Sequence, residues 1–341
     1  MKSRIIKKKD IPALLDKLIQ QNDVFAPVSE NSVIAFNRIE SGSRALIGYQ
    51  ISKLSPKNVH FPQSEALFRY KIGEDQDELK VPVESEKALL IFGIRPCDAF
   101  AETMLDKVFQ GKKYSDPYYV NRRAKTTVVS IGCIKAGPAC FCTSVDGAPF
   151  STEGSDVMLI DIGDEYVLQP ITDKGTALLQ STGLAEAPDS NQAEADKIKK
   201  MDVPMSTVKT EGLKKKLDSR YEDAIWQKLN EKCLSCGICT YLCPTCHCFD
   251  ILDEQDRTGG ERIRLWDSCQ FPQFTLQASG INPRPTNRER MRQRIMHKFS
   301  YFIDDNGLIG CVGCGRCVTE CPVNLDIREI LNTIAELEVA R

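Results

Sequence analysis

Residues 233–244, CLSCGICTYLCP, and residues 311–322, CVGCGRCVTECP, decide the fold of the C-terminal third. Both follow the spacing C-x-x-C-x-x-C-x-x-x-C-P, and they are called here the first and the second cysteine run. In such a run, three thiolates on one tight loop can reach three irons of a single cluster. The fourth cysteine follows one helical turn later, and the proline after it redirects the chain. The runs therefore predict a domain built around metal clusters.

This spacing is that of bacterial two-cluster ferredoxins, in which the fourth cysteine of each run binds the other cluster. We therefore expect two [4Fe-4S] clusters. The ligands of one are expected to be Cys233, Cys236, Cys239 and Cys321, and those of the other Cys311, Cys314, Cys317 and Cys243. Zinc is the alternative, but zinc ribbons combine two separated C-x-x-C pairs into one site, whereas each run here supplies four cysteines. Two complete copies of the run favour iron–sulfur clusters.

A second, looser set of cysteines lies in the N-terminal half. Its members are Cys97, Cys133, Cys140 and Cys142. Two of them follow predicted buried strands, and the other two lie in a loop rich in Gly and Pro, where packing demands little. We predict that they hold a third [4Fe-4S] cluster, with buried hydrophobic packing as the alternative.

A last group follows the first cysteine run and consists of Cys246, His247, Cys248 and Cys269. The segment CPTCHCF could wrap back to supply a substitute ligand. The two runs already provide eight ligands, however, so we expect this group to pack beside a cluster without binding it.

Composition limits the class of protein. The 341 residues suffice for two domains, and 45 basic against 47 acidic residues leave a net charge of −2, which disfavours binding to nucleic acid or to a membrane surface. No apolar stretch approaches the roughly 18 residues that span a bilayer, and no secretion signal follows the basic N-terminus. We expect a cytoplasmic protein with no membrane insertion, in which most of the 15 cysteines stay reduced and bind metal rather than form disulfides.

Hydrophobic patterns outline the remaining fold. They predict helices over 11–19, 98–109 and 221–229, buried strands over 87–94 and 126–133, further strands over 33–39 and 45–51, and a hairpin formed by 156–162 and 165–171. The order strand, helix, strand indicates a parallel βαβ unit, at whose carboxyl edge Cys97 and Cys133 would lie. We predict an α/β (α+β) N-terminal domain over 1–172, a helical connector over 173–220, and a mainly helical ferredoxin-like dicluster domain over 221–341 with an insertion at about 249–305.

Residues 284–298, RPTNRERMRQRIMHK, carry five Arg, one Lys and one His against a single Glu. This segment is either a solvated helix face or a source of positive charge for thiolate-ligated clusters or an acidic partner. Dinucleotide, P-loop, nucleophile-elbow and zinc-protease motifs are absent, and three histidines leave little for general acid–base catalysis. The sequence indicates electron transfer more than a substrate site.

Five segments carry a more specific resemblance: GIRPCD (93–98), AGPACFC (136–142), CPTCHCFD (243–250), RLWDSC (264–269) and RMRQRIMHKFSYF (290–302). With the second cysteine run they resemble the iron–sulfur subunits of cytoplasmic multi-subunit oxidoreductases. These include the sulfhydrogenase beta subunit and the iron–sulfur subunit of anaerobic sulfite reductase. The resemblance extends over most of the chain and is weakest over 173–220.

The resemblance implies an electron conduit between a flavin-containing subunit that reacts with NAD(P)H and a catalytic redox subunit. That catalytic subunit would be a hydrogenase, a sulfite reductase or a heterodisulfide-reductase-like module. The alternative is a redox enzyme in its own right, which would act on a sulfur compound at a cluster with an open iron position.

Overall fold

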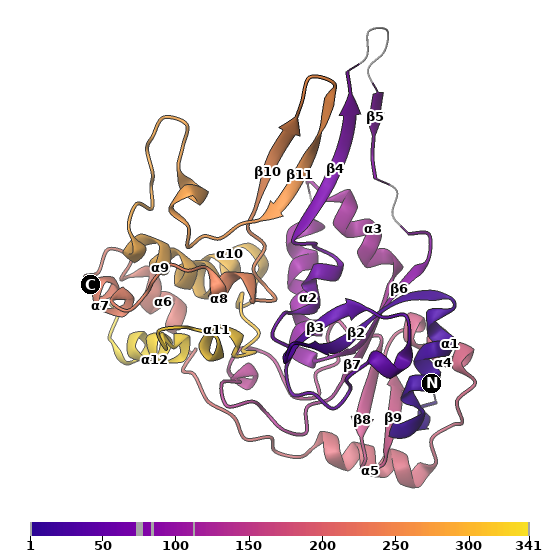
Figure 1. The fold of residues 1–341 in the computed structure, drawn as a ribbon. Helices are drawn as coiled ribbons and strands as arrows, with labels where there is room; N and C mark the ends of the chain where they lie inside the picture. Colours follow the sequence, from indigo (N-terminus) through magenta and orange to yellow (C-terminus); the bar gives the residue numbers. More distant parts are fainter. Residues whose placement is uncertain (1, 73–77, 83–84, 112, 340–341) are drawn as a thin grey trace.

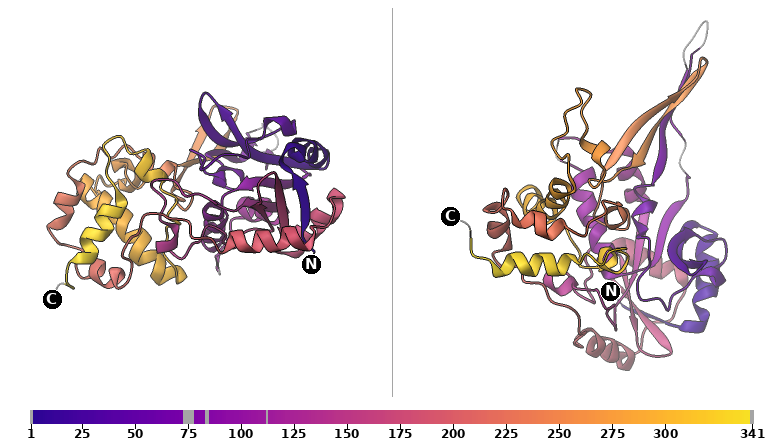
Figure 2. Two further views of the ribbon diagram at one scale, coloured as in Figure 1. Left: turned by 90° about the horizontal axis from the view of Figure 1, so that it is seen from below. Right: turned by 60° about the vertical axis from the view of Figure 1, so that its left-hand side comes forward.

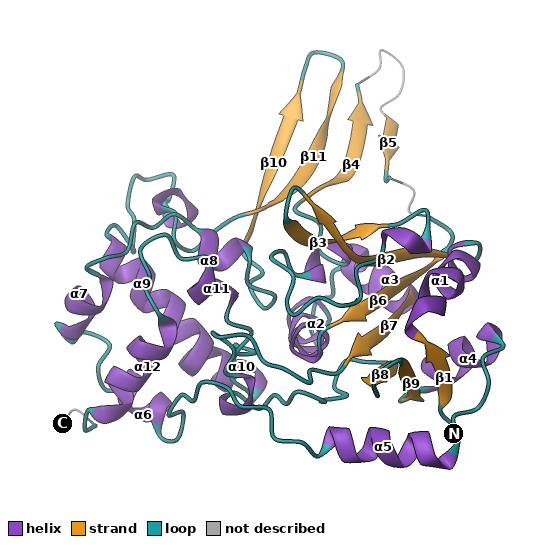
Figure 3. Ribbon diagram, turned by 60° about the horizontal axis from the view of Figure 1, so that its bottom comes forward, coloured by secondary structure: helices purple, strands orange, loops and turns teal. Residues whose placement is uncertain are grey.

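The computed structural model describes residues 2–72, 78–82, 85–111 and 113–339. An α/β part and a helical part lie side by side, and a long sheet projects from between them (Figures 1 and 3). The two termini lie at opposite ends of the molecule (Figure 2). The expected combination of an α/β region and a C-terminal region rich in helix is confirmed.

A seven-stranded sheet forms the centre of the α/β part, in the order β1-β9-β8-β7-β6-β2-β3. The four inner strands β2, β6, β7 and β8 are parallel, and the outer strands are antiparallel to their neighbours. The strands are β1 (Arg4–Lys7), β2 (Asn22–Glu30), β3 (Val33–Arg38), β6 (Ala88–Ile94), β7 (Thr126–Ile131), β8 (Val157–Asp161) and β9 (Glu165–Pro170).

Helices cover both faces of this sheet, because its inner strands are apolar on both sides. On β6, Leu90 and Phe92 pack in the core that contains α1 and α4, whereas Ile91 faces the core below α2. Met158 of β8 packs against α5 on that second face. The helices of the α/β part are α1 (Ile11–Ile19), α2 (Pro96–Phe109), α3 (Pro117–Lys125), α4 (Asp173–Thr182) and α5 (Asp189–Lys199).

The structure confirms the predicted helix over 11–19, the two buried strands and the hairpin of β8 and β9 to within a few residues. The strand predicted over 45–51 is wrong. After a short 3-10 turn at Gly42–Arg44, this segment is a loop, because β2 already occupies the inner side of β3. Its side chains pack instead: Tyr49 lies against Phe36 and donates a hydrogen bond to the Gly93 carbonyl at 2.8 Å.

The projecting sheet, called here the β arm, combines two distant segments of the chain. Its order is β10-β11-β4-β5, and all its pairs are antiparallel. The hairpin of β10 and β11 falls within the expected insertion and pairs with β4 from the N-terminal half. The strands are β4 (Ser64–Lys71), β5 (Glu78–Lys80), β10 (Phe249–Gln255) and β11 (Gly259–Trp266).

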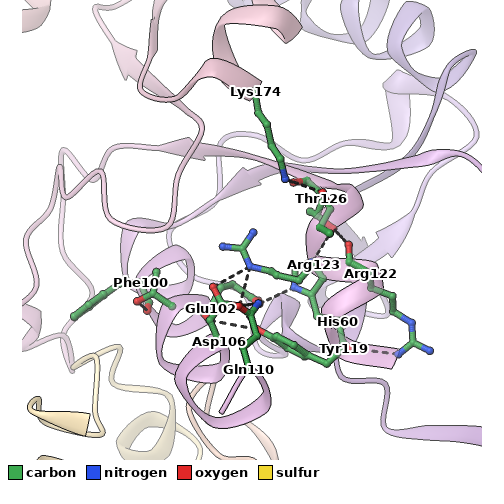
Figure 4. A network of polar contacts seen from close by, with 12 residues as sticks. His60, Phe100, Glu102, Asp106, Gln110, Tyr119, Arg122, Arg123, Thr126 and Lys174 are labelled. Carbon is green, nitrogen blue, oxygen red and sulfur yellow. Dashed lines mark hydrogen bonds and ion pairs between the residues drawn. The ribbon is translucent and has the colours of Figure 1, made fainter. Parts of the chain in front are cut away.

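A buried polar network ties α2, α3 and β7 together (Figure 4). His60 lies with Nδ1 2.6 Å from Glu102 Oε2 and Nε2 2.8 Å from Thr126 Oγ1. Because the Thr126 hydroxyl donates its one hydrogen to the Arg122 carbonyl, His60 Nε2 must donate to Thr126. Burial opposes ionisation of Glu102, but the charge of His60 outweighs it and lowers the pKa of Glu102. The network therefore holds His60 by hydrogen bonds at both ring nitrogens, one to Glu102 and one to Thr126.

The helical part surrounds the two cysteine runs. Its elements are α6 (Leu213–Asp218), α7 (Ile225–Asn230), α8 (Ile238–Tyr241), α9 (Asn287–Met296), a π-helical turn (His297–Tyr301), α10 (Phe302–Asn306), α11 (Arg316–Thr319) and α12 (Ile327–Glu336). Apolar residues at helical spacing on α12, such as Leu331 and Ile334, pack with Trp226 and Phe299 in one core. The helix predicted over 221–229 begins later, at Ile225. Among the described residues, no helix is both long enough and apolar enough to span a membrane.

Candidate metal-cluster site

The cysteines expected to hold the first cluster line one cavity, of about 40 Å³. They are Cys233, Cys236, Cys239 and Cys321. Cys233 and Cys236 lie on the loop that leads into α8. Cys239 lies in α8 itself, and Cys321 follows α11. Apolar side chains, among them Met291, Ile327 and Ile330, complete the wall, and Cys236 lies on its exposed side.

The cysteines expected to hold the other cluster line a second cavity, of about 20 Å³. They are Cys243, Cys311, Cys314 and Cys317. Cys317 also lines the first cavity, and Arg294 lies in the wall of both. The two cavities are therefore immediate neighbours.

Glycines allow the second cysteine run to lie close to the loop at residues 137–142. Gly313 and Gly315 have φ values of +61° and +79°, in the left-handed region that favours glycine. A Cβ on Gly313 would lie 2.6 Å from backbone atoms of Cys142, and one on Gly315 equally close to the carbonyl carbon of Ala139. Either substitution would thus push the loop away from the second cavity.

That loop brings the looser set of cysteines to the second cavity. Phe141 N donates to Gly313 O at 2.8 Å, and Cys140 Sγ lies 3.8 Å from Cys314 O. Cys97 lies within electrostatic range of Cys314 and Cys133, and Cys142 within range of Cys133 and Cys140. The four thiols are therefore gathered in one region beside the second cavity. Cys97 belongs to the first turn of α2, which begins two residues before the predicted helix.

An open cleft of about 360 Å³ lies at the carboxyl edge of the sheet, and Cys133 lies in its wall. Arg95, which is buried, stacks over the Tyr49 ring at 4.5 Å and donates to the Gly132 carbonyl at 3.3 Å. Parallel sheets commonly place ligands at this edge. The cleft gives a small molecule access to the looser set of thiols.

The interpretation of the basic segment, residues 284–298, as a solvated helix face is wrong, because most of its cations are buried. The four that are buried are Arg290, Arg292, Arg294 and Lys298. A capping box formed by Thr286 and Glu289 fixes the start of α9, and the π-helical turn that follows carries Lys298 inward. Lys298 Nζ donates to Cys243 Sγ at 3.3 Å. This segment therefore supplies positive charge to the thiols.

Burial governs the protonation of two thiols of the second cavity in the absence of metal. It raises the pKa of Cys311 to about 11 and that of Cys314 to about 12. Metal-free Cys311 and Cys314 are therefore neutral at pH 7, and ligation converts them to thiolates with release of protons. The pKa of Cys243 is lowered instead, by its hydrogen bond with Cys246 and by the charge of Lys298. The charges of Lys298 and Arg294 then lie against anionic sulfur.

The remaining group lies beside the first cysteine run. The thiol of Cys246 hydrogen-bonds with that of Cys243, and the thiol of Cys248 with that of Cys269. His247 is half-buried, and desolvation lowers its pKa to about 4, which keeps its ring neutral at pH 7. Sequence reasoning expected only packing from these residues.

The donor sets fit iron–sulfur clusters better than zinc. The eight donors around the two cavities are all cysteine sulfurs. Within the described ranges, no three or more His, Cys, Asp or Glu side chains converge closely enough to hold a single metal ion. Four thiols spread around a cavity instead suit a group that is larger than one ion.

Replacing Lys298 with Met is expected to lower the reduction potential of a cluster bound at Cys243. A buried ammonium that donates to a ligand sulfur stabilises the reduced, more negative state. Loss of a charged hydrogen bond worth about 1.5 kcal/mol corresponds to roughly 60 mV for one electron. A redox titration followed by EPR measures the shift, with the exposed Lys215→Met as the matched control. Equal potentials in the two variants would contradict this role.

Comparison with known proteins agrees with this geometry. Residues 232–325 match the family of 4Fe-4S dicluster domains, which implies two [4Fe-4S] clusters. The chain is 31% identical over 331 residues to the sulfhydrogenase 2 subunit beta of Pyrococcus furiosus, and the match covers 95% of this chain and 96% of that protein. No solved structure matches the chain. The chain therefore belongs to the family of sulfhydrogenase beta subunits, which in this case carries a 4Fe-4S dicluster domain.

Proposed function

We propose that this chain is an electron-transfer subunit that relays single electrons through a row of iron–sulfur clusters. The observation that carries the proposal is the continuity of the thiols. Cys317 is shared by the walls of the two cavities, and Cys314 joins the second cavity to the looser set through Cys140 and Cys97. A row of neighbouring clusters lets an electron cross the protein in short steps.

The proposed ligands are the four cysteines of each cavity, and the proposed third cluster is held by Cys97, Cys133, Cys140 and Cys142. When bound, each [4Fe-4S] cluster exchanges one electron with little rearrangement. The protein holds the thiols in place, shields them with apolar walls and supplies charge through Lys298.

Both ends of the row of thiols reach the protein surface, and we propose that each end contacts a partner. At one end, Cys236 is exposed and the adjacent Leu234 is 63% exposed. At the other end, Cys133 borders the open cleft, where Ile134 is 51% exposed. Apolar surface beside a redox centre suits docking of another subunit.

The proposed partners are a flavin-containing subunit that reacts with NAD(P)H and a catalytic redox subunit. The name of the P. furiosus relative describes it as one subunit of a sulfhydrogenase. For this chain, the catalytic partner is proposed to be a hydrogenase, a sulfite reductase or a heterodisulfide-reductase-like module, in the cytoplasm.

A second candidate function is a redox reaction of a sulfur compound at a cluster with an open iron position. The observation that favours it is the cleft beside Cys133, into which the Arg95 side chain would bring a positive charge. Activity of the isolated chain on a sulfur compound would support this alternative.

The full chain, purified and kept anaerobic, tests the proposal. A low-potential one-electron donor such as dithionite should bleach its visible absorption, whereas NADPH alone should not, because the chain lacks a dinucleotide fingerprint. About 12 iron atoms per chain in these cysteine sets would mean three clusters, and about 8 would mean two. Rapid reduction by NADPH without a flavin-containing protein would contradict the proposed division of labour.

A further inference from the structure

We infer that Arg294 is a counter-charge shared by the two ferredoxin-type clusters, and that its guanidinium raises the reduction potentials of both. The inference rests on the two proposed ligand sets of four cysteines. It goes beyond them by assigning a function in electron transfer to a residue that binds no iron and lies in neither cysteine run.

Arg294 lies where the two cavities meet. Among the described residues, those that line both cavities are Arg294, Cys317 and Ile327, and of these only the arginine carries a charge. Helix α9 directs it there. Met291 and Ile295, which lie on the same face of α9, also line the first cavity. The side chain of Arg294 is therefore held between the two proposed cluster sites.

The guanidinium of Arg294 has no partner within the described part of the protein. The residue is 4% exposed, no described carboxylate forms an ion pair with it, and Nη1 is buried without a hydrogen-bond acceptor. Arginine is not deprotonated in proteins, so the charge persists. A buried charge without a counter-charge costs several kcal/mol. The counter-charge is therefore expected from the groups that the two cavities hold.

The other buried arginines of α9 do have partners. Arg290 Nη1 donates to the Pro285 carbonyl at 2.9 Å, and Arg292 Nη1 lies 3.1 Å from Glu222 Oε2. Neither of these two arginines lines a cavity of the proposed ligands. Burial in α9 alone thus does not account for Arg294, and its distinguishing feature is the pair of cavities beside it.

Cluster-bound thiolates would supply the missing negative charge. Arg294 lies within electrostatic range of Cys239 in the first cavity and of Cys243 in the second. Reduction adds a further negative charge to a cluster that is already anionic. A fixed positive charge nearby therefore stabilises the reduced form more than the oxidised form, which raises the reduction potential.

The shared position of Arg294 distinguishes it from Lys298. Lys298 lines only the second cavity, where it donates to Cys243. Removal of the Lys298 charge should act mainly on one cluster, whereas removal of the Arg294 charge should act on both. A shared charge keeps the two potentials high together, which suits transfer of an electron from one cluster to the next.

A purely structural role is the alternative, in which Arg294 only fills the wall between the cavities. Met291 and Ile295 already fill that face of α9 with apolar groups. A neutral side chain of similar length would fill the remaining space without the cost of burying a charge. The charge itself is therefore the property that needs an explanation.

A redox titration followed by EPR tests the inference on the full chain, purified anaerobically with its clusters. Arg294→Met removes the charge, and Arg294→Lys keeps it. The matched control is Arg292→Met, which removes a buried guanidinium from the same helix and whose partner Glu222 is exposed. For Arg294→Met, we expect each cluster to lose its preference for the reduced form by about tenfold, which is about 59 mV for one electron. Arg294→Lys should restore most of this loss, and Arg292→Met should leave both potentials unchanged.

A measurement on the wild-type chain decides the question if Arg294→Met loses its clusters. Arginine labelled with ¹⁵N only in the guanidinium is incorporated during growth, and pulsed EPR detects coupling of the label to a reduced cluster. Within the described residues, Arg294 is the one arginine in the wall of the first cavity. We expect ¹⁵N coupling to both clusters.

Several results would overturn the inference. They are unchanged potentials in Arg294→Met, a shift of one cluster alone, an equal shift in Arg292→Met, no recovery in Arg294→Lys, or no ¹⁵N coupling to the cluster of the first cavity. If the wild type holds two reducible clusters, these results leave the proposed electron relay intact. A wild-type chain without reducible clusters would overturn the relay and this inference together.

Discussion

Replacing Cys314 with Ala is expected to remove about four iron atoms per chain and to stop electron transfer through the protein. Cys314 lines the second cavity, and its carbonyl accepts the Cys140 thiol of the adjoining set. Its position is therefore central in the row. Alanine supplies no ligand, and without the central cluster the remaining centres are separated by a gap that a single electron must cross in one step.

Anaerobic iron analysis and stopped-flow absorption measure this loss. Electrons are supplied by dithionite at one end, and a one-electron dye accepts them. Thr319→Ala is the matched control, since it removes a hydroxyl from an exposed residue of α11 without touching sulfur. The control should retain its iron and its transfer rate. Cys314→Ala protein with a full complement of iron would refute the assignment of Cys314 as a ligand.

The local parts of this architecture could be predicted from sequence. The spacing within each cysteine run fixes which thiols share a loop, and the structure places each expected set of four around its own cavity. Helix α1 and the hairpin of β8 and β9 could be predicted equally well, because the apolar periodicity of each lies within a short stretch of sequence.

The parts that depend on distant segments could not be predicted. In the β arm, β4 pairs with β11, which lies almost 200 residues later in the sequence. The hydrophobic pattern of neither strand indicates which strand it pairs with. The basic segment looked like a solvated face because charge alone does not reveal burial; only the packed structure shows Lys298 directed at Cys243. The contacts of Lys57 required the same information, since they are made with Cys246 and Trp266, about 190 residues or more further along the chain.

Replacing Asp98 with Ala is expected to destabilise the fold by about 3–5 kcal/mol, through the loss of a buried ion pair between α2 and α11. Arg316 holds Asp98 through two parallel hydrogen bonds, Nη1 to Oδ1 at 2.6 Å and Nη2 to Oδ2 at 2.7 Å. Both side chains are almost fully buried. The variant would leave the guanidinium without its counter-charge, with only Ser52 as a remaining hydrogen-bond partner.

Urea unfolding of the anaerobic full chain measures this effect. Asp253→Ala, which breaks the exposed pair of Asp253 and Arg262 on the β arm, is the matched control and should change stability by less than about 1 kcal/mol. In the double variant Asp98→Ala/Arg316→Met, no buried charge is stranded, so part of the loss should be recovered. If the double variant were no more stable than Asp98→Ala, the loss of stability in Asp98→Ala would come from lost packing. The ion pair of Asp98 and Arg316 would then not be what stabilises the contact between the α/β part and the second cysteine run.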